Sequence, residues 1–250
     1  MSGHSKWSTI KRKKGAIDAK RGKVFTKIIK EISIAVKEGG SSDPESNPRL
    51  RLAISNAKGA NMPKDNVERA IKKASDKDGA KYEYVTYEGY GPYGIAFFIE
   101  ASTDNINRTV SNVRAIFTKY NGSLGTNGSL EFMFDRKGVF TIPVENISMD
   151  NEAFEMELID GGAEEVEKEG DVVIVYTSFE DFGTMQKKLE ELNVETESAD
   201  LQRIPNTTSA LDIHESKTIL NMVDKFDEDE DVNNVFHNLE MTDELLEQLD

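Results

Sequence analysis

The chain has 250 residues, 37% of them hydrophobic and 31% charged, with a formal net charge of −15. It contains no cysteine, which excludes disulfides and thiolate metal sites and fits a reducing compartment, so a cytoplasmic location is expected. No stretch approaches the roughly 20 apolar residues that a membrane helix needs, and the basic start lacks the apolar run of a signal peptide.

Charge is distributed unevenly along the chain. Residues 1–80 contain 19 Lys+Arg against 9 Asp+Glu, whereas residues 81–250 contain 12 against 37. A basic head attracts polyanions, and an acidic remainder is repelled by them. We therefore expect the protein to bind a polyanion head first, without wrapping around it.

The first third of the chain predicts a small helical domain behind a basic arm. Residues 1–21 have no clean apolar period and are expected to be extended or loosely helical. Beyond them, apolar residues recur at helical spacing, and Asn47 followed by Pro48 is typical of an N-cap and first helical position. The predicted helices span residues 22–40, 48–59 and 63–74.

After residue 80 the pattern changes to segments rich in aromatic and β-branched residues, which favour strands. The middle segment is predicted to contain strands at 81–89, 94–102 and 129–134 and a helix at 105–122. Residues 138–205 are predicted to form strand–helix–strand–strand–helix–strand, the ferredoxin-like order. A final helix at 214–226 and strand at 232–240 have no partners of their own, so they are expected to return to the middle sheet.

This organisation predicts an α+β protein of three domains. An N-terminal helical domain precedes two small α/β-sandwich (ferredoxin-like) domains, one inserted in the other. The expected boundaries are a basic helical domain with its arm at 1–78, a middle α+β domain at 79–135 plus 205–240, an inserted ferredoxin-like domain at 136–204, and an acidic tail at 241–250.

Several motifs could carry chemistry, but each has a simpler interpretation. Gly89 to Gly94 match the dinucleotide pattern G-x-G-x-x-G, yet a strand follows instead of a helix, which indicates a Gly-rich hairpin loop. His214 and His237 fall in no metal motif and are expected to be surface or cap residues. With Met1 removed, Ser2-Gly3-His4 could chelate Cu(II) or Ni(II), but any chain start with a third-position histidine would do so, and we expect neither metal nor cofactor.

The acidic run Asp227–Asp231 is expected to be a solvated, self-repelling surface. No carboxylate pair can be singled out as general acid and base, and the chain has no cysteine nucleophile, nucleophile elbow or P-loop. The sequence therefore indicates a protein that is not an enzyme and has no evident small-molecule substrate.

The basic arm is the strongest functional signal. A run of charges is usually a solvated surface, but this run lies in an acidic protein and is interrupted by small residues that allow close backbone approach. Trp7, the only tryptophan, could stack on a base or sugar, and the cations could neutralise phosphates. Asp18 is the only acidic residue among the seven cations, which are Lys11, Arg12, Lys13, Lys14, Lys20, Arg21 and Lys23. Nucleic-acid binding is the favoured interpretation, although no zinc-finger, basic-zipper or RRM signature is present.

The order of several long motifs resembles the YebC/PmpR family, whose mitochondrial relative is the translational activator of cytochrome c oxidase subunit I. The motifs are "GHSKW" at 3–7, "KGAIDAKRGKVFTKIIKEI" at 14–32, "NPRLRLAI" at 47–54, "NMPKDNVERAIKKA" at 61–74, "YEGYGPYGIA" at 87–96, "DNINRTVSNVR" at 104–114, "GSLGTNGS" at 122–129 and "VFHNLE" at 235–240. The resemblance implies three α+β domains, one of them inserted. It also implies a DNA-binding transcriptional regulator, or a translation factor that acts on ribosomes stalled at proline-rich stretches, with basic segments near ribosomal RNA.

The residues expected to bind nucleic acid are His4, Lys6, Trp7, Lys11, Arg12, Lys13, Lys14, Lys20, Arg21 and Lys23. Tyr87, Tyr90 and Tyr93 form a possible second contact surface, although aromatic residues beside a hairpin are more often local packing. The favoured partner is DNA or ribosomal RNA, with the ribosome as a further partner and no membrane. A Gly-interrupted arm without a recognition-helix pattern favours RNA, whereas the family label favours DNA; an enzyme of unknown type is the third hypothesis.

Overall fold

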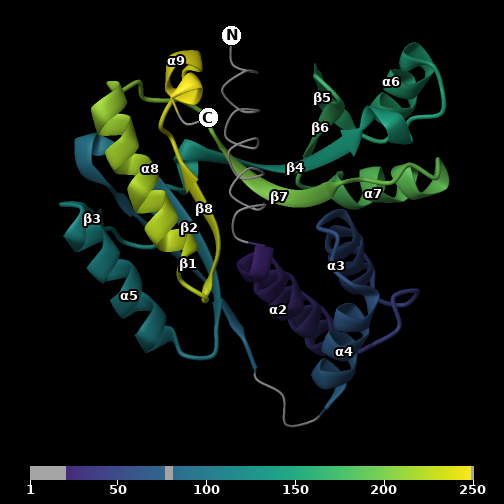
Figure 1. Cartoon of the computed structure of the whole chain (residues 1–250), viewed down its shortest axis with the longest axis horizontal. Coiled ribbons are helices and arrows are strands. Elements are labelled where there is room, and N and C mark those ends of the chain that lie inside the picture. Colours follow the sequence, from purple (N-terminus) through teal and green to yellow (C-terminus); the bar gives the residue numbers. More distant parts are fainter. Residues whose placement is uncertain (1–20, 77–80, 249–250) are drawn as a thin grey trace. The chain divides into compact units, whose positions relative to one another are not determined.

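The computed structural model describes residues 21–76 and 81–248 (Figure 1). The described chain packs into two compact units, one made of residues 81–135 and 203–248 and the other of residues 21–76 and 136–202. Two antiparallel four-stranded sheets and a set of helices make the fold α+β, as the sequence predicts. No helix of the described ranges is long and apolar enough to cross a bilayer.

Three helices form the N-terminal part of the second unit: α2 (Arg21–Gly39), α3 (Pro48–Gly59) and α4 (Lys64–Ser75). The predicted cap of α3 is confirmed, because the Asn47 side chain accepts a hydrogen bond from the Leu50 N–H and Pro48 occupies the first turn. The Asn47 amide also donates to the Ala35 carbonyl at 2.8 Å, which ties α3 to the end of α2. The buried residues that form the small core between the helices are Ile32, Ala35, Val36, Leu50, Ala53, Ala57, Met62, Val67, Ala70 and Ala74.

The rest of the second unit has the predicted ferredoxin-like element order. Its elements are β4 (Phe134–Pro143), α6 (Asn151–Asp160), β5 (Ala163–Glu169), β6 (Val172–Ser178), α7 (Phe182–Glu191) and β7 (Ser198–Pro205). The strand order β5-β6-β4-β7 places the first and third strands of this segment side by side in the centre, which is the split βαβ arrangement. The inward faces of α6 and α7 bury Phe154, Leu158, Met185 and Leu189 against Phe140 and Val175.

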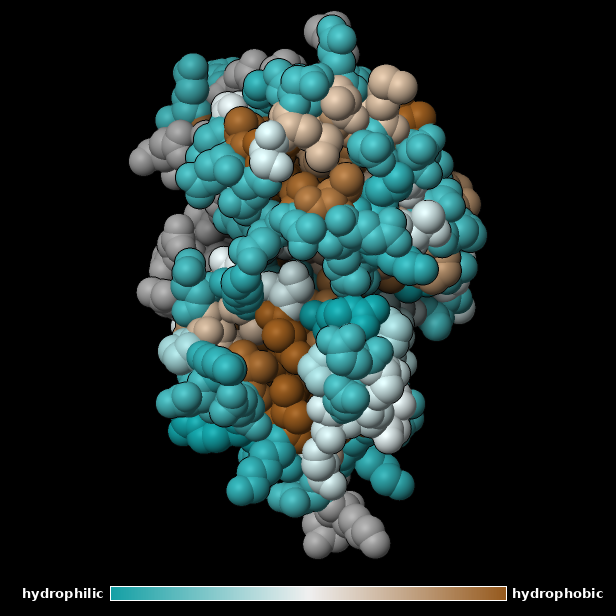
Figure 2. Space-filling model, turned by 90° about the vertical axis from the view of Figure 1, so that its right-hand side faces the viewer, coloured by the Kyte–Doolittle hydropathy of each residue, from teal (hydrophilic) through white to brown (hydrophobic). Residues whose placement is uncertain are grey.

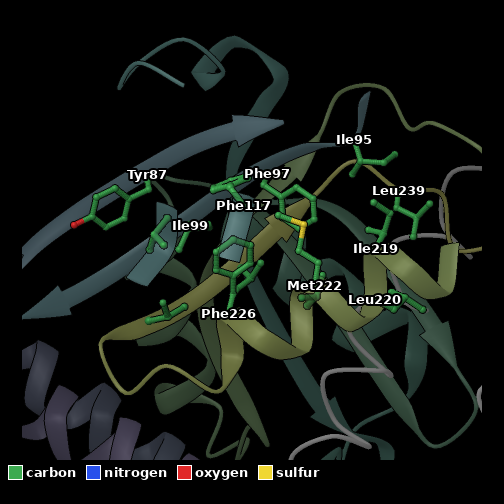
Figure 3. Close-up of a cluster of buried hydrophobic side chains, with 14 of the residues drawn as sticks. Tyr87, Ile95, Phe97, Ile99, Phe117, Ile219, Leu220, Met222, Phe226 and Leu239 are labelled. Carbon is green, nitrogen blue, oxygen red and sulfur yellow. The ribbon is translucent and has the colours of Figure 1, made fainter. Parts of the chain in front are cut away.

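The first unit contains β1 (Glu83–Tyr90), β2 (Ala96–Thr103), α5 (Ile106–Lys119), β3 (Ser123–Leu124), α8 (Ile213–Asp227), β8 (Val232–His237) and α9 (Asp243–Glu247). Its sheet has the order β3-β1-β2-β8, so the C-terminal helix and strand return to the middle sheet as predicted. The core shown in Figure 3 is built on Phe97, whose ring lies 6.1 Å from that of Phe117 and 5.9 Å from that of Phe226.

One predicted strand is wrong. Residues 129–134 do not form the third strand of the middle sheet; residues Glu131–Met133 make a 3-10 turn, and Phe134 begins β4 instead. The third strand is the two-residue β3, which pairs with Gly89 and Tyr90. A β-carbon on Gly89 would lie 2.4 Å from the Ser123 carbonyl oxygen, so this close pairing depends on a glycine that β-propensity alone disfavours.

Within the second unit, α3 packs against β7, an edge strand of the ferredoxin-like sheet. The Asn56 side-chain amide donates to the Ala199 carbonyl and its oxygen accepts from the Ala199 N–H, each at 3.0 Å. An edge strand normally leaves such backbone groups unpaired, and here the Asn56 side chain supplies their hydrogen-bond partners. The predicted domain boundaries remain a prediction. Packing places the helical part and the inserted sheet in one compact unit.

Replacing Gly59 by alanine tests how much this contact contributes to stability. Its β-carbon would lie 1.8 Å from the Glu197 carbonyl oxygen, so α3 and β7 must separate. We expect Gly59→Ala to lower the free energy of unfolding by about 1–3 kcal/mol, measured by urea denaturation. Gly183→Ala in α7, where nothing lies within 4 Å, is the control and should be neutral or stabilising; equal effects of the two changes would contradict the contact.

Candidate nucleic-acid interface

The structure describes only the end of the predicted basic arm. Arg21 is the first residue of α2, and Lys23 lies in the first turn of that helix with an exposed side chain. That turn carries no acidic residue, and the unpaired N–H groups at a helix start favour anions. The other predicted residues lie outside the described ranges; they are His4, Lys6, Trp7, Lys11, Arg12, Lys13, Lys14 and Lys20.

The helical part carries a second group of exposed cations, on α4, that the sequence analysis did not single out. Lys72 and Lys73 are exposed and form no ion pair with any residue that the structure describes, and Lys64 and Arg69 lie on the same polar side of the helix. The signal for them was available, because the apolar residues of "KDNVERAIKKAS" occupy one helical face and leave the lysines on the other. Residues 21–76 contain 12 Lys+Arg against 7 Asp+Glu, so this part remains basic without the arm.

The three tyrosines of the possible second surface separate into two kinds. Tyr87 is buried in the core of the first unit (Figure 3), so its assignment to a contact surface is wrong. It lies on the face of β1 that turns toward α5 and α8, a consequence of strand alternation. Tyr90 and Tyr93 are 43% and 48% exposed and remain available to a partner.

The turn that presents Tyr93 is a Gly-rich hairpin, as the sequence predicts. It connects β1 and β2, which pair antiparallel from Tyr90 and Ala96 onward. Tyr93 itself has a φ of 60°, a conformation that bulky residues rarely adopt because the β-carbon crowds the backbone. The turn therefore holds an exposed aromatic ring in a strained backbone, a feature that clusters at binding sites.

A neighbouring loop is fixed by a buried carboxylate. Glu88, only 1% exposed, accepts hydrogen bonds from the N–H groups of Gly128 and Leu130 at 2.6 and 2.5 Å. The Glu88 carbonyl accepts a third from the Gly125 N–H at 2.7 Å. These bonds hold residues 125–130 in one conformation beside β1.

The two other well-buried carboxylates are also held by structural partners. Asp231 accepts hydrogen bonds from Arg108 at 2.7 Å and from the Thr109 hydroxyl at 2.8 Å. Glu100 accepts from Arg203 at 3.0 Å, and the Arg203 guanidinium lies 3.8 Å from the centre of the Phe98 ring. Both carboxylates therefore connect residues of the first unit that are distant in the sequence.

The burial of Asp231 corrects the expectation that the whole acidic run is solvated. Its carboxylate is paired with Arg108, whose pKa is raised by its hydrogen bonds to Asp231 and Asp104. The run nevertheless remains exposed at Glu228 and Glu230, and the half-buried Asp229 accepts a hydrogen bond from the Asn112 amide at 2.8 Å. Asp231, the residue directly before β8, thus connects the start of α5 to the start of that strand.

The described histidines do not form a metal site. His214 is exposed near the start of α8, as expected, but His237 is 7% exposed, which contradicts its prediction as a surface or cap residue. Its Nδ1 accepts the Leu239 N–H at 3.3 Å, and its ring lies 6.1 Å from that of Phe97. No group of three metal-ligating side chains occurs in the ranges the structure describes.

Comparison with known proteins places this arrangement in a family. Residues 5–77 match the family model described as the TACO1/YebC protein N-terminal domain, and residues 82–239 match the TACO1/YebC second and third domain. The chain belongs to the TACO1/YebC family. The family resemblance expected from the sequence motifs is thereby confirmed.

The family relatives share the full length of the chain. A protein from Geotalea uraniireducens is 49% identical over 250 residues, covering 100% of both chains, and one from Treponema denticola is 51% identical, covering 96% of this chain and 97% of the other. Both bear the name "probable transcriptional regulatory protein". The crystal structure of a conserved hypothetical protein from Aquifex aeolicus is 40% identical, covers 92% of this chain and 94% of that one, and has a TM-score of 0.79.

Replacing Tyr87 by phenylalanine distinguishes packing from contact. The Tyr87 hydroxyl is buried without a hydrogen-bond partner among the described residues, and burial followed by Asp231 and Asp229 raises the pKa of the phenol. Removing it relieves a desolvation penalty, so we expect Tyr87→Phe to raise the free energy of unfolding by about 1 kcal/mol, measured by thermal and urea denaturation, with unchanged nucleic-acid affinity. Tyr90→Phe, at a 43% exposed residue of β1, is the stability control and should leave the free energy of unfolding nearly unchanged. A stability loss in Tyr87→Phe would indicate a partner for its hydroxyl and contradict the prediction.

Proposed function

We propose that the protein is a non-enzymatic regulator of gene expression that binds nucleic acid through its basic N-terminal part, a DNA-binding transcriptional regulator of the YebC/PmpR type. The names of the full-length relatives support a regulatory role. The observation that carries nucleic-acid binding is the separation of charge, with 19 Lys+Arg against 9 Asp+Glu in residues 1–80 of a chain whose net charge is −15.

The binding chemistry proposed for the head is phosphate neutralisation supported by stacking. The arm lysines and arginines, from Lys11 to Lys23, would contact phosphates, while Trp7 and His4 would stack or hydrogen-bond. Lys72 and Lys73 of α4 extend this proposed surface, because they are exposed and without an anionic partner in the described chain. Such contacts give affinity that is independent of sequence and falls steeply with salt.

A ribosome-associated translation factor is the second candidate. It would bind ribosomal RNA through the same head and relieve stalling at proline-rich stretches. The exposed rings of Tyr90 and Tyr93 favour it. Unpaired bases of folded RNA can stack on exposed aromatic side chains, whereas the paired and stacked bases of a duplex cannot. Tyr90 and Tyr93 are therefore the proposed second contact, with Tyr87 removed from that set.

Alanine replacement of Lys11, Arg12, Lys13 and Lys14 tests the head. We expect weaker binding to a short mixed-sequence duplex and to a ribosomal RNA fragment. The log–log slope of affinity against salt should fall by about one unit for each phosphate that the variant no longer neutralises. Fluorescence anisotropy across a salt series measures both quantities. The Lys72→Ala, Lys73→Ala pair is expected to lower the slope in the same assay.

The matched control removes four exposed lysines from the acidic remainder: Lys119, Lys168, Lys187 and Lys217, each to Ala. It changes the net charge as much as the arm variant does. If binding depended on net charge alone, the two variants would show equally reduced affinity, and the proposed role of the arm would be wrong.

In-cell ultraviolet crosslinking followed by sequencing of attached RNA and DNA distinguishes the two mechanisms. A transcriptional regulator should give reads concentrated at promoter DNA, with ribosomal RNA at background. A translation factor should give reads at a few positions of ribosomal RNA. In either case the signal should fall in Lys20→Ala, Arg21→Ala, because those cations are proposed to contact phosphate; unchanged crosslinking would contradict their role.

A further inference from the structure

The outward face of α6 carries two large apolar side chains that nothing in the described chain covers. Met156 is 71% exposed and Ile159 is 60% exposed. They are three residues apart and therefore adjacent on the helix surface, while Phe154 and Leu158 fill the opposite, buried face. Single exposed apolar residues are ordinary, but two on one helical turn form a continuous apolar surface.

Carboxylates surround this apolar pair. Helical spacing places Glu152 and Glu155 on the same outward side of α6 as Met156 and Ile159, and Asp160 beside them; all three acids are exposed. Neither Glu152 nor Glu155 has a cationic partner among the described residues. Figure 2, which faces the side of the molecule where Figure 1 labels α6, shows tan and brown side chains among the teal ones.

The charge of the whole segment restricts what can bind there. Residues 136–202 contain 18 Asp+Glu against 5 Lys+Arg, a formal charge of −13. A field of this sign repels nucleic acid and anionic lipid headgroups. It also opposes a symmetric dimer through this face, because a two-fold axis would bring the same carboxylates of both copies together.

We propose that this face of α6 docks a basic amphipathic segment of a partner protein. Apolar side chains of the segment lie against Met156 and Ile159, and its lysines and arginines meet Glu152, Glu155 and Asp160. Methionine suits such a contact because its flexible thioether adapts to different apolar shapes. Complementary charge sets the orientation and speeds the encounter, and the apolar pair, which docking buries, provides the specificity for an amphipathic sequence.

This surface is independent of nucleic-acid binding, which is proposed for the basic end of the chain. The two proposals can therefore fail separately. A variant of α6 should leave the salt-dependent binding of DNA and RNA unchanged, and a variant of the arm should leave the α6 contact unchanged.

The test uses the full chain and two synthetic peptides of identical composition rich in leucine, lysine and arginine. One has leucines at helical spacing along one face; the other has the same residues scrambled, without an apolar stripe. By fluorescence anisotropy we expect the amphipathic peptide to bind at least about 10-fold more tightly than the scrambled one, because only it presents a contiguous apolar face to Met156 and Ile159. Equal affinities would mean attraction to charge alone and would overturn the proposal.

Two variants locate the contact. Met156→Ser with Ile159→Ser should lower the affinity for the amphipathic peptide about 10-fold with little change in the melting temperature, because both side chains are exposed. Glu152→Gln with Glu155→Gln should weaken it and flatten its salt dependence. The matched control, Phe132→Ser with Ile106→Ser, removes two exposed apolar side chains from the first unit and should leave the affinity unchanged.

Other occupants of the face give different results. Concentration-dependent dimerisation in analytical ultracentrifugation, abolished by Met156→Ser with Ile159→Ser, would assign the face to a second copy of the chain and overturn the proposal. Sedimentation with phosphatidylglycerol vesicles that depends on Met156 and Ile159 would assign it to a membrane and overturn it too. We expect neither result. The proposal would also be wrong if Phe132→Ser with Ile106→Ser lowered the peptide affinity as much as Met156→Ser with Ile159→Ser does.

Discussion

The separation of positive from negative charge is the constraint on which the proposed functions depend. Residues 21–76 have a formal charge of +5, whereas residues 136–202 have −13. Screening at physiological salt limits interactions between exposed charges to about 8 Å, so we propose that the two surfaces bind different partners. A phosphate backbone selects the basic part and turns the acidic part away, and a basic protein segment does the reverse.

The two kinds of surface are nevertheless built on one compact unit. The ion pairs Arg51–Glu190 and Lys58–Glu195 connect α3 to the ferredoxin-like segment, but exposed pairs of this kind contribute little to stability. The specific part of the contact is the amide of Asn56, which completes the backbone hydrogen bonds of Ala199 on the edge of the sheet. Gly59 then allows the helix to approach the strand at a distance that any side chain would prevent.

Local chemistry made most elements predictable from the sequence. Asn47 followed by Pro48 identified the start of α3, and segments rich in aromatic and β-branched residues identified the strands of both sheets except β3. The return of α8 and β8 to the middle sheet followed from economy of pairing. The wrong predictions for His237 and Asp231 share a cause, because the burial of both residues depends on partners that are distant in the sequence. His237 is buried because Phe97 lies opposite it in the sheet, and Asp231 because Arg108 starts the helix beside it. For the site, the arm remains a prediction, while the exposed cations of α4 were visible in the helical pattern and were missed.

The buried carboxylates of the described chain support the surfaces that are proposed to bind partners. Glu88 holds a loop, Glu100 pairs with Arg203, and Asp231 fastens α5, so the three carboxylates that are buried in the described ranges all have hydrogen-bond partners. The fold therefore uses its buried charges to position exposed ones, and recognition of phosphate by cations or of a basic segment by carboxylates needs no reactive group.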